Sequence, residues 1–177
     1  MNKEFTLSLF TENHIGLLNQ VTNILTRRQI NIESITASES AVKGVHLITI
    51  VVHTSGQMIE KVASQIDKKI DVLKVFVHQK EELIYQEIAL YKVQTGELMS
   101  SNKIESIVRN NNARFLEITP DYAVIEKTGH KKETTDLLNK LHPYGVLQFA
   151  RSGRVAITKQ RKELLQYLEE IDARKNN

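Results

Sequence analysis

Cysteine is absent from the 177 residues of this chain. Its absence excludes disulfide bonds, thiolate catalysis and cysteine-based metal sites, and it fits a reducing compartment. No stretch approaches the roughly 18 consecutive apolar residues that suggest a membrane-spanning helix. Residues 1–4 lead directly into a strand pattern, without the apolar segment of a signal peptide or the Arg- and Ser-rich composition of a transit peptide. We therefore expect a cytoplasmic protein.

A strong excess of one charge is also missing, because 24 Lys and Arg residues face 21 Asp and Glu residues. This balance disfavours nucleic-acid binding, which usually needs a clear basic patch. The motifs HExxH, GxGxxG, GxSxG and the P-loop do not occur, and the six histidines form no tight cluster of metal ligands. The sequence therefore argues against a free-standing enzyme and predicts neither catalytic nor metal-binding residues in this chain.

The first half of the chain alternates strand and helix patterns. Alternating apolar residues and runs of β-branched residues indicate strands, and one-sided apolar stripes indicate helices. The predicted order is a strand at 5–10, a helix from Leu17, strands at 30–38 and 45–53, a helix opened by Ser55-Gly56, and a strand at 72–77. This βαββαβ order is that of the ferredoxin-like fold.

The second half repeats the same order with little sequence identity. Its predicted elements are a strand at 84–93, a helix with Ile104, Ile107 and Val108 that Ser100-Ser101 would cap, strands at 113–118 and 122–128, a helix with Leu137, Leu138 and Leu141, a strand at 146–150, and a last helix with Leu164, Leu168 and Ile171. We therefore predict an α+β protein with two ferredoxin-like βαββαβ domains in tandem, at residues 1–79 and 84–177, joined by a short polar linker.

A loop that closes at Gly16 and opens a helix is the most informative segment. Such a loop presents backbone N–H groups that lack intrahelical partners, and these donors favour an anion such as a carboxylate. The side-chain amides of Asn13 and Asn31 would accept hydrogen bonds from an ammonium group. Apolar side chains for the wall of an amino-acid site are available at Leu17, Leu18 and Ile32. The same residues also allow a purely structural interpretation, in which Gly16 is a turn residue and Asn13 caps the helix.

Several motifs in this order resemble the small regulatory subunits of acetolactate synthase, whose first domain is an ACT domain. They are the NxxGxL pattern of Asn13, Gly16 and Leu18, the NIxS pattern of Asn31, Ile32 and Ser34, and the segments Asp71–Val75, Glu87–Leu90, Ile118–Pro120 and Ala150–Gly153. The resemblance covers about residues 4–158. It implies an effector site formed by Asn13, His14, Ile15, Gly16, Leu17, Leu18, Asn31 and Ile32.

The resemblance also implies the partners and the function. We expect a homodimer formed through the ACT domains, and a separate large catalytic subunit that carries thiamine diphosphate, Mg²⁺ and FAD. No cofactor would be held in this chain. It would activate the catalytic subunit and confer feedback inhibition by a branched-chain amino acid, most often valine. The alternatives are another amino-acid-sensing ACT regulator or a nucleic-acid-binding ferredoxin-like protein.

The sequence departs from the family pattern close to the implied effector site. Gln20 stands where arginine is usual, and Ser38 stands where a small apolar residue is common. Gln29 stands where glycine is usual, so we expect the first helix to end without the usual left-handed glycine. The segment Arg151-Ser152-Gly153 has two interpretations, as a binding element for an anion or the catalytic partner, or as the end of a strand.

Overall fold

The computed structural model describes residues 2–96, 103–160, 166 and 169, and the chain forms two compact units. The first unit comprises residues 1–84 together with 154–177, and the second comprises residues 85–153. The sequence-based division at 1–79 and 84–177 differs from these units in one main respect. It assigns the residues after Gly153 to the second domain, whereas the structure assigns them to the first unit. The predicted cap at Ser100-Ser101 and the predicted last helix with Leu164, Leu168 and Ile171 lie outside the described residues. Within the described part of the chain, no helix is long and apolar enough to cross a membrane.

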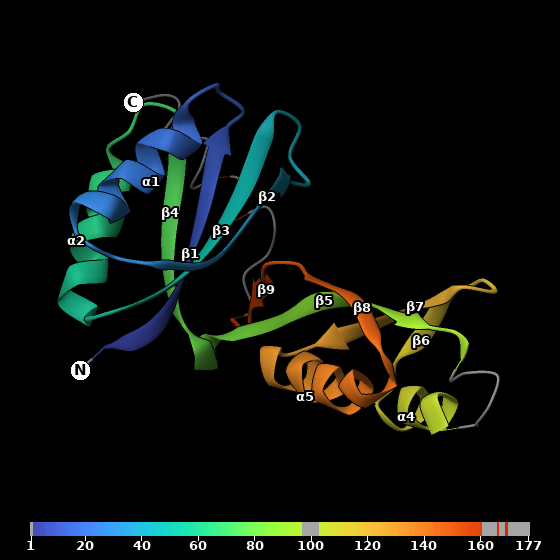
Figure 1. The fold of residues 1–177 in the computed structure, drawn as a ribbon. Helices are drawn as coiled ribbons and strands as arrows, with labels where there is room; N and C mark the ends of the chain where they lie inside the picture. Colours follow the sequence, from blue (N-terminus) through green and yellow to red (C-terminus); the bar gives the residue numbers. More distant parts are fainter. Residues whose placement is uncertain (1, 97–102, 161–165, 167–168, 170–177) are drawn as a thin grey trace. The chain divides into compact units, whose positions relative to one another are not determined.

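The first unit has the predicted βαββαβ order. Its elements are β1 (Lys3–Glu12), α1 (Leu17–Arg27), β2 (Ile32–Glu39), β3 (Val45–Thr54), α2 (Gly56–Asp67), β4 (Val72–Gln79) and the 3₁₀ turn η1 (Lys80–Glu82). The strands form one antiparallel sheet in the order β2-β3-β1-β4, and both helices cover the same face of it (Figure 1). This confirms the predicted ferredoxin-like architecture.

The core of the first unit lies between that sheet face and the two helices. Every second residue of β1 points into it, because successive side chains of a strand point to opposite faces. The apolar stripe of α1 packs on these residues, and Leu7, Leu9 and Val21 are completely buried. At the start of α2, the Ser55 hydroxyl accepts a hydrogen bond from the Met58 N–H at 3.3 Å, as a helix N-cap does.

The end of α1 keeps a left-handed residue although it is not glycine. Gln29 has a φ of 54°. Its N–H donates to the carbonyl of Thr26 at 2.9 Å, and the Ile30 N–H donates to Leu25 at 3.0 Å, which closes the helix as a left-handed cap does. A side chain with a Cβ atom therefore occupies a conformation that glycine adopts at lower cost.

The second unit repeats the arrangement. Its elements are β5 (Leu83–Gln94), α4 (Lys103–Asn110), β6 (Arg114–Ile118), β7 (Tyr122–Gly129), α5 (Lys131–Leu141), the 3₁₀ turn η2 (His142–Tyr144) and β8 (Val146–Arg151). The strand order β6-β7-β5-β8 matches the order in the first unit, and α4 and α5 lie on one face of the sheet (Figure 1). The core gathers around Tyr91, Ile125 and Leu137, none of which is exposed to solvent.

The chain then enters a short strand, β9 (Val155–Thr158), that the sequence analysis did not predict. Together with Arg154, Lys159 and Gln160 we call this segment the strap. The strap belongs to the first unit. The Lys159 N–H donates to the carbonyl of Glu82 at 2.8 Å, and the Thr36 hydroxyl donates to the carbonyl of Arg154 at 3.0 Å. Residues far apart in sequence thus form one compact unit.

Candidate functional site

The loop between β1 and α1 is held against the segment that precedes β4. The Glu12 N–H donates to the carbonyl of Asp71 at 2.9 Å, and the His14 N–H donates to the carbonyl of Glu12 at 3.0 Å. The imidazole Nδ1 of His14 lies 3.7 Å from a carboxylate oxygen of Asp71. These contacts give the loop a defined path into α1.

Gly16 is the residue at which the backbone changes direction and enters helix α1. Its φ of 87° is left-handed, and no side chain caps the helix at this end. Asn13 is therefore not the helix cap that the structural interpretation of the loop required. The Leu17 N–H donates to the carbonyl of His14 at 3.3 Å, and the Gln20 N–H donates to the carbonyl of Gly16 at 3.1 Å. The N–H groups of Leu18 and Asn19 between them have no intrahelical acceptor by geometry. The start of α1 can therefore offer donors to a carboxylate.

The predicted site residues around the loop differ in exposure. Ile15 is 98% exposed and Leu18 is 43% exposed, whereas Leu17 is 3% exposed and packs in the core. Asn13, His14 and Gly16 are exposed. A cluster of exposed apolar side chains at a helix start is costly in water, which favours cover by a ligand or by another protein surface.

Asn31 and Ile32 lie at the opposite end of the same sheet. Ile32 pairs with Val52, and Val52 pairs with Phe5 near the start of β1. The loop instead follows Glu12, which pairs with Val45. The distance along β1 from Phe5 to Glu12 is about 23 Å, because a strand rises ~3.3 Å per residue. One protomer therefore does not bring Asn31 beside Gly16.

The strap contributes a buried charge cluster to the first unit that the sequence analysis missed. Arg154 is 5% exposed. Its guanidinium donates to the carboxylate of Glu4 at 2.9 Å and to the hydroxyl of Thr6 at 2.8 Å. Thr6 is completely buried although it lies on the sheet face opposite the helices. No local motif marks this arrangement, because its members are about 150 residues apart in sequence.

The predicted segment Arg151-Ser152-Gly153 is engaged in contacts within the second unit. The guanidinium of Arg151 donates to the Thr135 hydroxyl at 2.7 Å and lies 3.6 Å from the carboxylate of Glu87. The Ser152 hydroxyl accepts a hydrogen bond from the Ile88 N–H at 2.9 Å. These contacts support the interpretation of the segment as the end of a strand.

A buried phenol lies in the core of the second unit. The Tyr91 hydroxyl donates to the backbone carbonyl of Thr134 at 2.6 Å. Burial raises the pKa of Tyr91 to about 12, and the nearby positive charge of Arg151 opposes part of that shift. Tyr91 thus remains protonated at neutral pH and connects β5 to α5.

Comparison with known families gives matches to both halves of the chain. Residues 7–74 match a family model described as the AHAS small subunit-like ACT domain, and residues 86–160 match one described as the small subunit of acetolactate synthase. The acetolactate synthase small subunit of Bacillus subtilis is 34% identical over 154 residues, covering 86% of this chain and 89% of that protein. The acetolactate synthase small subunit of Mycobacterium bovis is 32% identical over 157 residues, covering 89% of this chain and 93% of that protein.

A solved structure agrees with these sequence matches. The crystal structure of the acetolactate synthase small subunit from Thermotoga maritima superposes with a TM-score of 0.81 at 29% sequence identity. The match covers 90% of this chain and 99% of that chain. The similarity therefore extends over both units and is not confined to the loop motifs.

Proposed function

This chain belongs to the family of acetolactate synthase small subunits, and from that premise we propose that its first unit senses a branched-chain amino acid and passes the signal to a catalytic subunit. Small subunits of this family are regulatory, and the catalytic subunit is a separate chain. Thiamine diphosphate, Mg²⁺ and FAD belong to that catalytic subunit. In the described part of this chain, no group of three or more His, Cys, Asp or Glu residues is arranged to hold a metal ion.

The observation that carries this proposal is the separation of the two motifs in one protomer. The loop with Gly16 lies at the Glu12 end of the sheet, and Asn31 lies at the Phe5 end. Both motifs can contribute to one amino-acid site only if a second copy supplies one of them. A two-fold axis makes two such sites at once, because each copy offers its loop to the other copy's Asn31.

Pairing through the β2 edges satisfies this requirement. β2 is an edge strand that runs parallel to β1, since both are antiparallel to β3. When two β2 strands lie antiparallel across a two-fold axis, the Ile32 end of one copy lies level with the Glu39 end of the other. The Glu39 end is also the end that carries the loop, because Glu39 pairs with His46 beside Val45. Pairing would also cover an exposed strand edge, which isolated proteins tend to protect.

In this dimer the effector is held by three kinds of contact. The free N–H groups at the start of α1 receive its carboxylate. The side-chain amides of Asn13 and of Asn31 from the other copy accept hydrogen bonds from its ammonium group. Its branched side chain lies against Ile15 and Leu18, whose exposed surfaces it covers. Leu17 has a packing role instead, because it is buried in the core. We therefore propose valine or another branched-chain amino acid as the effector.

The effector signal must then reach the catalytic subunit. We propose that the second unit, residues 85–153, completes the coupling to that partner, while residues 1–79 contain the sensor. Coupling between two binding sites is reciprocal, so binding of the catalytic subunit and binding of valine must change each other's affinity by the same factor. This reciprocity gives a test of regulation that is independent of turnover.

Reconstitution with the cognate catalytic subunit tests the proposal. The small subunit alone should form no acetolactate from pyruvate. Added to the catalytic subunit, it should raise the rate of acetolactate formation and make that rate sensitive to valine. Valine, leucine and isoleucine should each be titrated by calorimetry against the isolated protein, with alanine as the control. Turnover by the purified small subunit, or activation without sensitivity to any of the three amino acids, would contradict the proposal. Sedimentation showing a monomer at micromolar concentration would contradict the dimer.

A further inference from the structure

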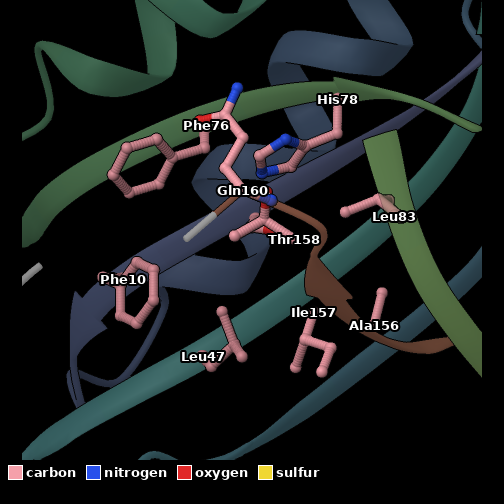
Figure 2. Close-up of a pocket in the computed structure, with 10 residues that line it drawn as sticks. Phe10, Leu47, Phe76, His78, Leu83, Ala156, Ile157, Thr158 and Gln160 are labelled. Carbon is pink, nitrogen blue, oxygen red and sulfur yellow. The ribbon is translucent and has the colours of Figure 1, made fainter. Parts of the chain in front are cut away.

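A chamber of about 320 Å³ lies on the face of the first sheet that α1 and α2 do not cover. Leu7 and Leu9 of β1 point into the core, so Ser8 and Phe10, which alternate with them along the strand, point to the opposite face. The strap contributes one wall of the chamber, which remains partly open to solvent (Figure 2). The lining residues are Ser8, Phe10, Leu47, Phe76, His78, Leu83, Ala156, Ile157, Thr158 and Gln160.

The walls of the chamber are mostly apolar and partly aromatic. The rings of Phe10 and Phe76 meet edge to face with centroids 6.0 Å apart, and the imidazole of His78 is stacked near Phe76 with centroids 6.2 Å apart. Ile157 and Thr158 reach in from the strap on the other side (Figure 2). Aromatic edges and faces of this kind favour a flat or branched apolar body.

The described residues that line the chamber offer no charged group to compensate a charged ligand. Among the described residues that line it, none is Asp, Glu, Lys or Arg. Burial lowers the pKa of His78 below its usual value, and the negative charge of Glu82 opposes that shift only in part. The imidazole is therefore mainly neutral at pH 7, with one ring nitrogen as a hydrogen-bond donor and the other as an acceptor. An ionised ligand would lose part of its hydration against these walls without gaining a charged partner among the described lining residues.

We propose that this chamber is a second ligand site, which binds a small uncharged molecule with an aromatic or branched apolar body and one hydroxyl or carbonyl group. The volume is about twice that of an engineered cavity known to bind benzene. His78 and Thr158 supply the hydrogen bonds, and the rings supply the apolar contact. The site differs in chemistry from the loop at Gly16, which offers donors to a charged carboxylate. It does not depend on the proposed amino-acid sensing.

Occupation of the chamber has a mechanical consequence, because its two sides come from different parts of the chain. Phe10 and Leu47 belong to the sheet, whereas Ala156 and Ile157 belong to the strap. A ligand in contact with both sides stabilises the packing of the strap on the sheet by mass action. The backbone hydrogen bond from Lys159 to Glu82 reports on that packing.

Three molecules of similar size and different charge test the ligand class. Benzyl alcohol, benzoate and benzylammonium should be titrated against the full-length protein, with binding followed by the methyl NMR signals of Leu47, Leu83 and Ile157. Benzyl alcohol should shift these signals with saturation, and the two ions should bind at least roughly tenfold more weakly because their charge is not compensated. The Lys159 amide should exchange more slowly in the presence of benzyl alcohol. Equal or tighter binding of either ion, or no saturable shift with benzyl alcohol, would overturn the proposal.

Variants separate the chamber from the rest of the strap. Ala156→Phe should fill the chamber and abolish binding of benzyl alcohol. The matched control is Val155→Phe, because Val155 is the neighbouring residue, is 65% exposed and does not line the chamber. Ala156→Phe could also abolish binding by displacing the strap. Ser8→Leu fills the chamber from the sheet side and distinguishes these two effects. His78→Phe should weaken benzyl alcohol severalfold while leaving toluene binding unchanged. Undiminished binding of benzyl alcohol to both Ala156→Phe and Ser8→Leu would place the ligand elsewhere.

Discussion

The guanidinium of Arg154 lies 2.9 Å from the carboxylate of Glu4, although the two residues are 150 positions apart in the sequence. Arg154 is 5% exposed, and Glu4 is partly shielded from solvent. The second hydrogen bond of the guanidinium, to Thr6, anchors it on the central strand of the sheet. The ion pair therefore fixes the strap to the sheet of the first unit, beside the chamber.

Arg154→Met should destabilise the first unit by about 2–4 kcal/mol, because it leaves Glu4 and Thr6 without their charged partner. Urea denaturation would measure the loss, and hydrogen exchange should show the amides of Val155–Thr158 losing protection. The matched control is Arg114→Met. Arg114 is 74% exposed where it pairs with Glu126, so this change should alter stability by less than about 1 kcal/mol. Equal effects of the two substitutions would show that the strap is not anchored by its buried arginine.

Gln29→Gly should stabilise the protein by about 1 kcal/mol. The φ of 54° at Gln29 is unfavourable for a residue with a Cβ atom, and glycine removes that cost. Asn112→Gly is the matched comparison, since Asn112 closes α4 with a φ of 51°. Asparagine tolerates left-handed geometry better than glutamine, so its replacement should gain less. Thermal denaturation of both variants measures the difference, and a larger gain at Asn112 would contradict this ranking.

The sequence predicts the regular elements well because their signals are local. The apolar stripe of α1 and the alternation of β1 each repeat within a few residues, and both elements lie where expected. The left-handed conformation of Gln29 was not predicted, because a left-handed helix end was associated with glycine and this position has none. The surrounding hydrogen bonds impose the left-handed conformation on the residue that is present.

The strap and the geometry of the motifs depend on tertiary structure. β9 has only four residues, and Arg154 meets Glu4 and Thr6 only after the whole second unit has intervened. The separation of Asn31 from Gly16 could have been deduced, since a helical crossover between parallel strands puts the end of one strand and the start of the next at opposite ends of a sheet. The motif spacing alone does not show it, because α1 spans most of the interval.

The second unit should lose stability between pH 10 and about 12. The pKa of Tyr91 is raised from 10.0 to about 12 in the folded protein, so the unfolded chain releases this proton first as the pH rises. Stability from the neutral phenol is complete below pH ~10 and declines until the folded pKa is passed, by an amount on the order of 2 kcal/mol. Tyr91→Phe should remove this decline while costing about 1 kcal/mol at pH 7 through the lost hydrogen bond to Thr134. Chemical denaturation at several pH values measures both effects, and a similar decline in Tyr91→Phe would assign it to other groups.

Gly16→Asp should weaken valine binding by roughly 30- to 1,000-fold, or about 2–4 kcal/mol. The added carboxylate competes with the effector carboxylate for the N–H donors at the start of α1. Gly16→Ala is the control without the charge: its conformational cost at a φ of 87° is at least that of aspartate, which tolerates left-handed geometry better than alanine, and the space at this position is open. Calorimetry with valine should show a much smaller loss for Gly16→Ala. Equal losses would mean that backbone conformation, and not charge, controls this loop.

Mixed dimers of two defective variants test whether one site uses residues of both copies. Asn31→Ala alone should weaken valine binding by about 1–2 kcal/mol, since it removes one amide contact. In a dimer of one Gly16→Asp copy and one Asn31→Ala copy, the loop of the second copy and the Asn31 of the first are both intact. These two form one complete site, while the other site carries both defects.

Random pairing makes about half of the dimers mixed, so about a quarter of all sites should regain the wild-type affinity. If each site lay within one copy, every site in the mixed dimer would keep one defect. Calorimetric titration of the co-refolded mixture distinguishes the two cases, because a separate mixture of the two homodimers contains no wild-type site in either case. If the co-refolded sample shows no fraction of sites with wild-type affinity for valine, the shared site is wrong and the loop at Gly16 is the whole effector site.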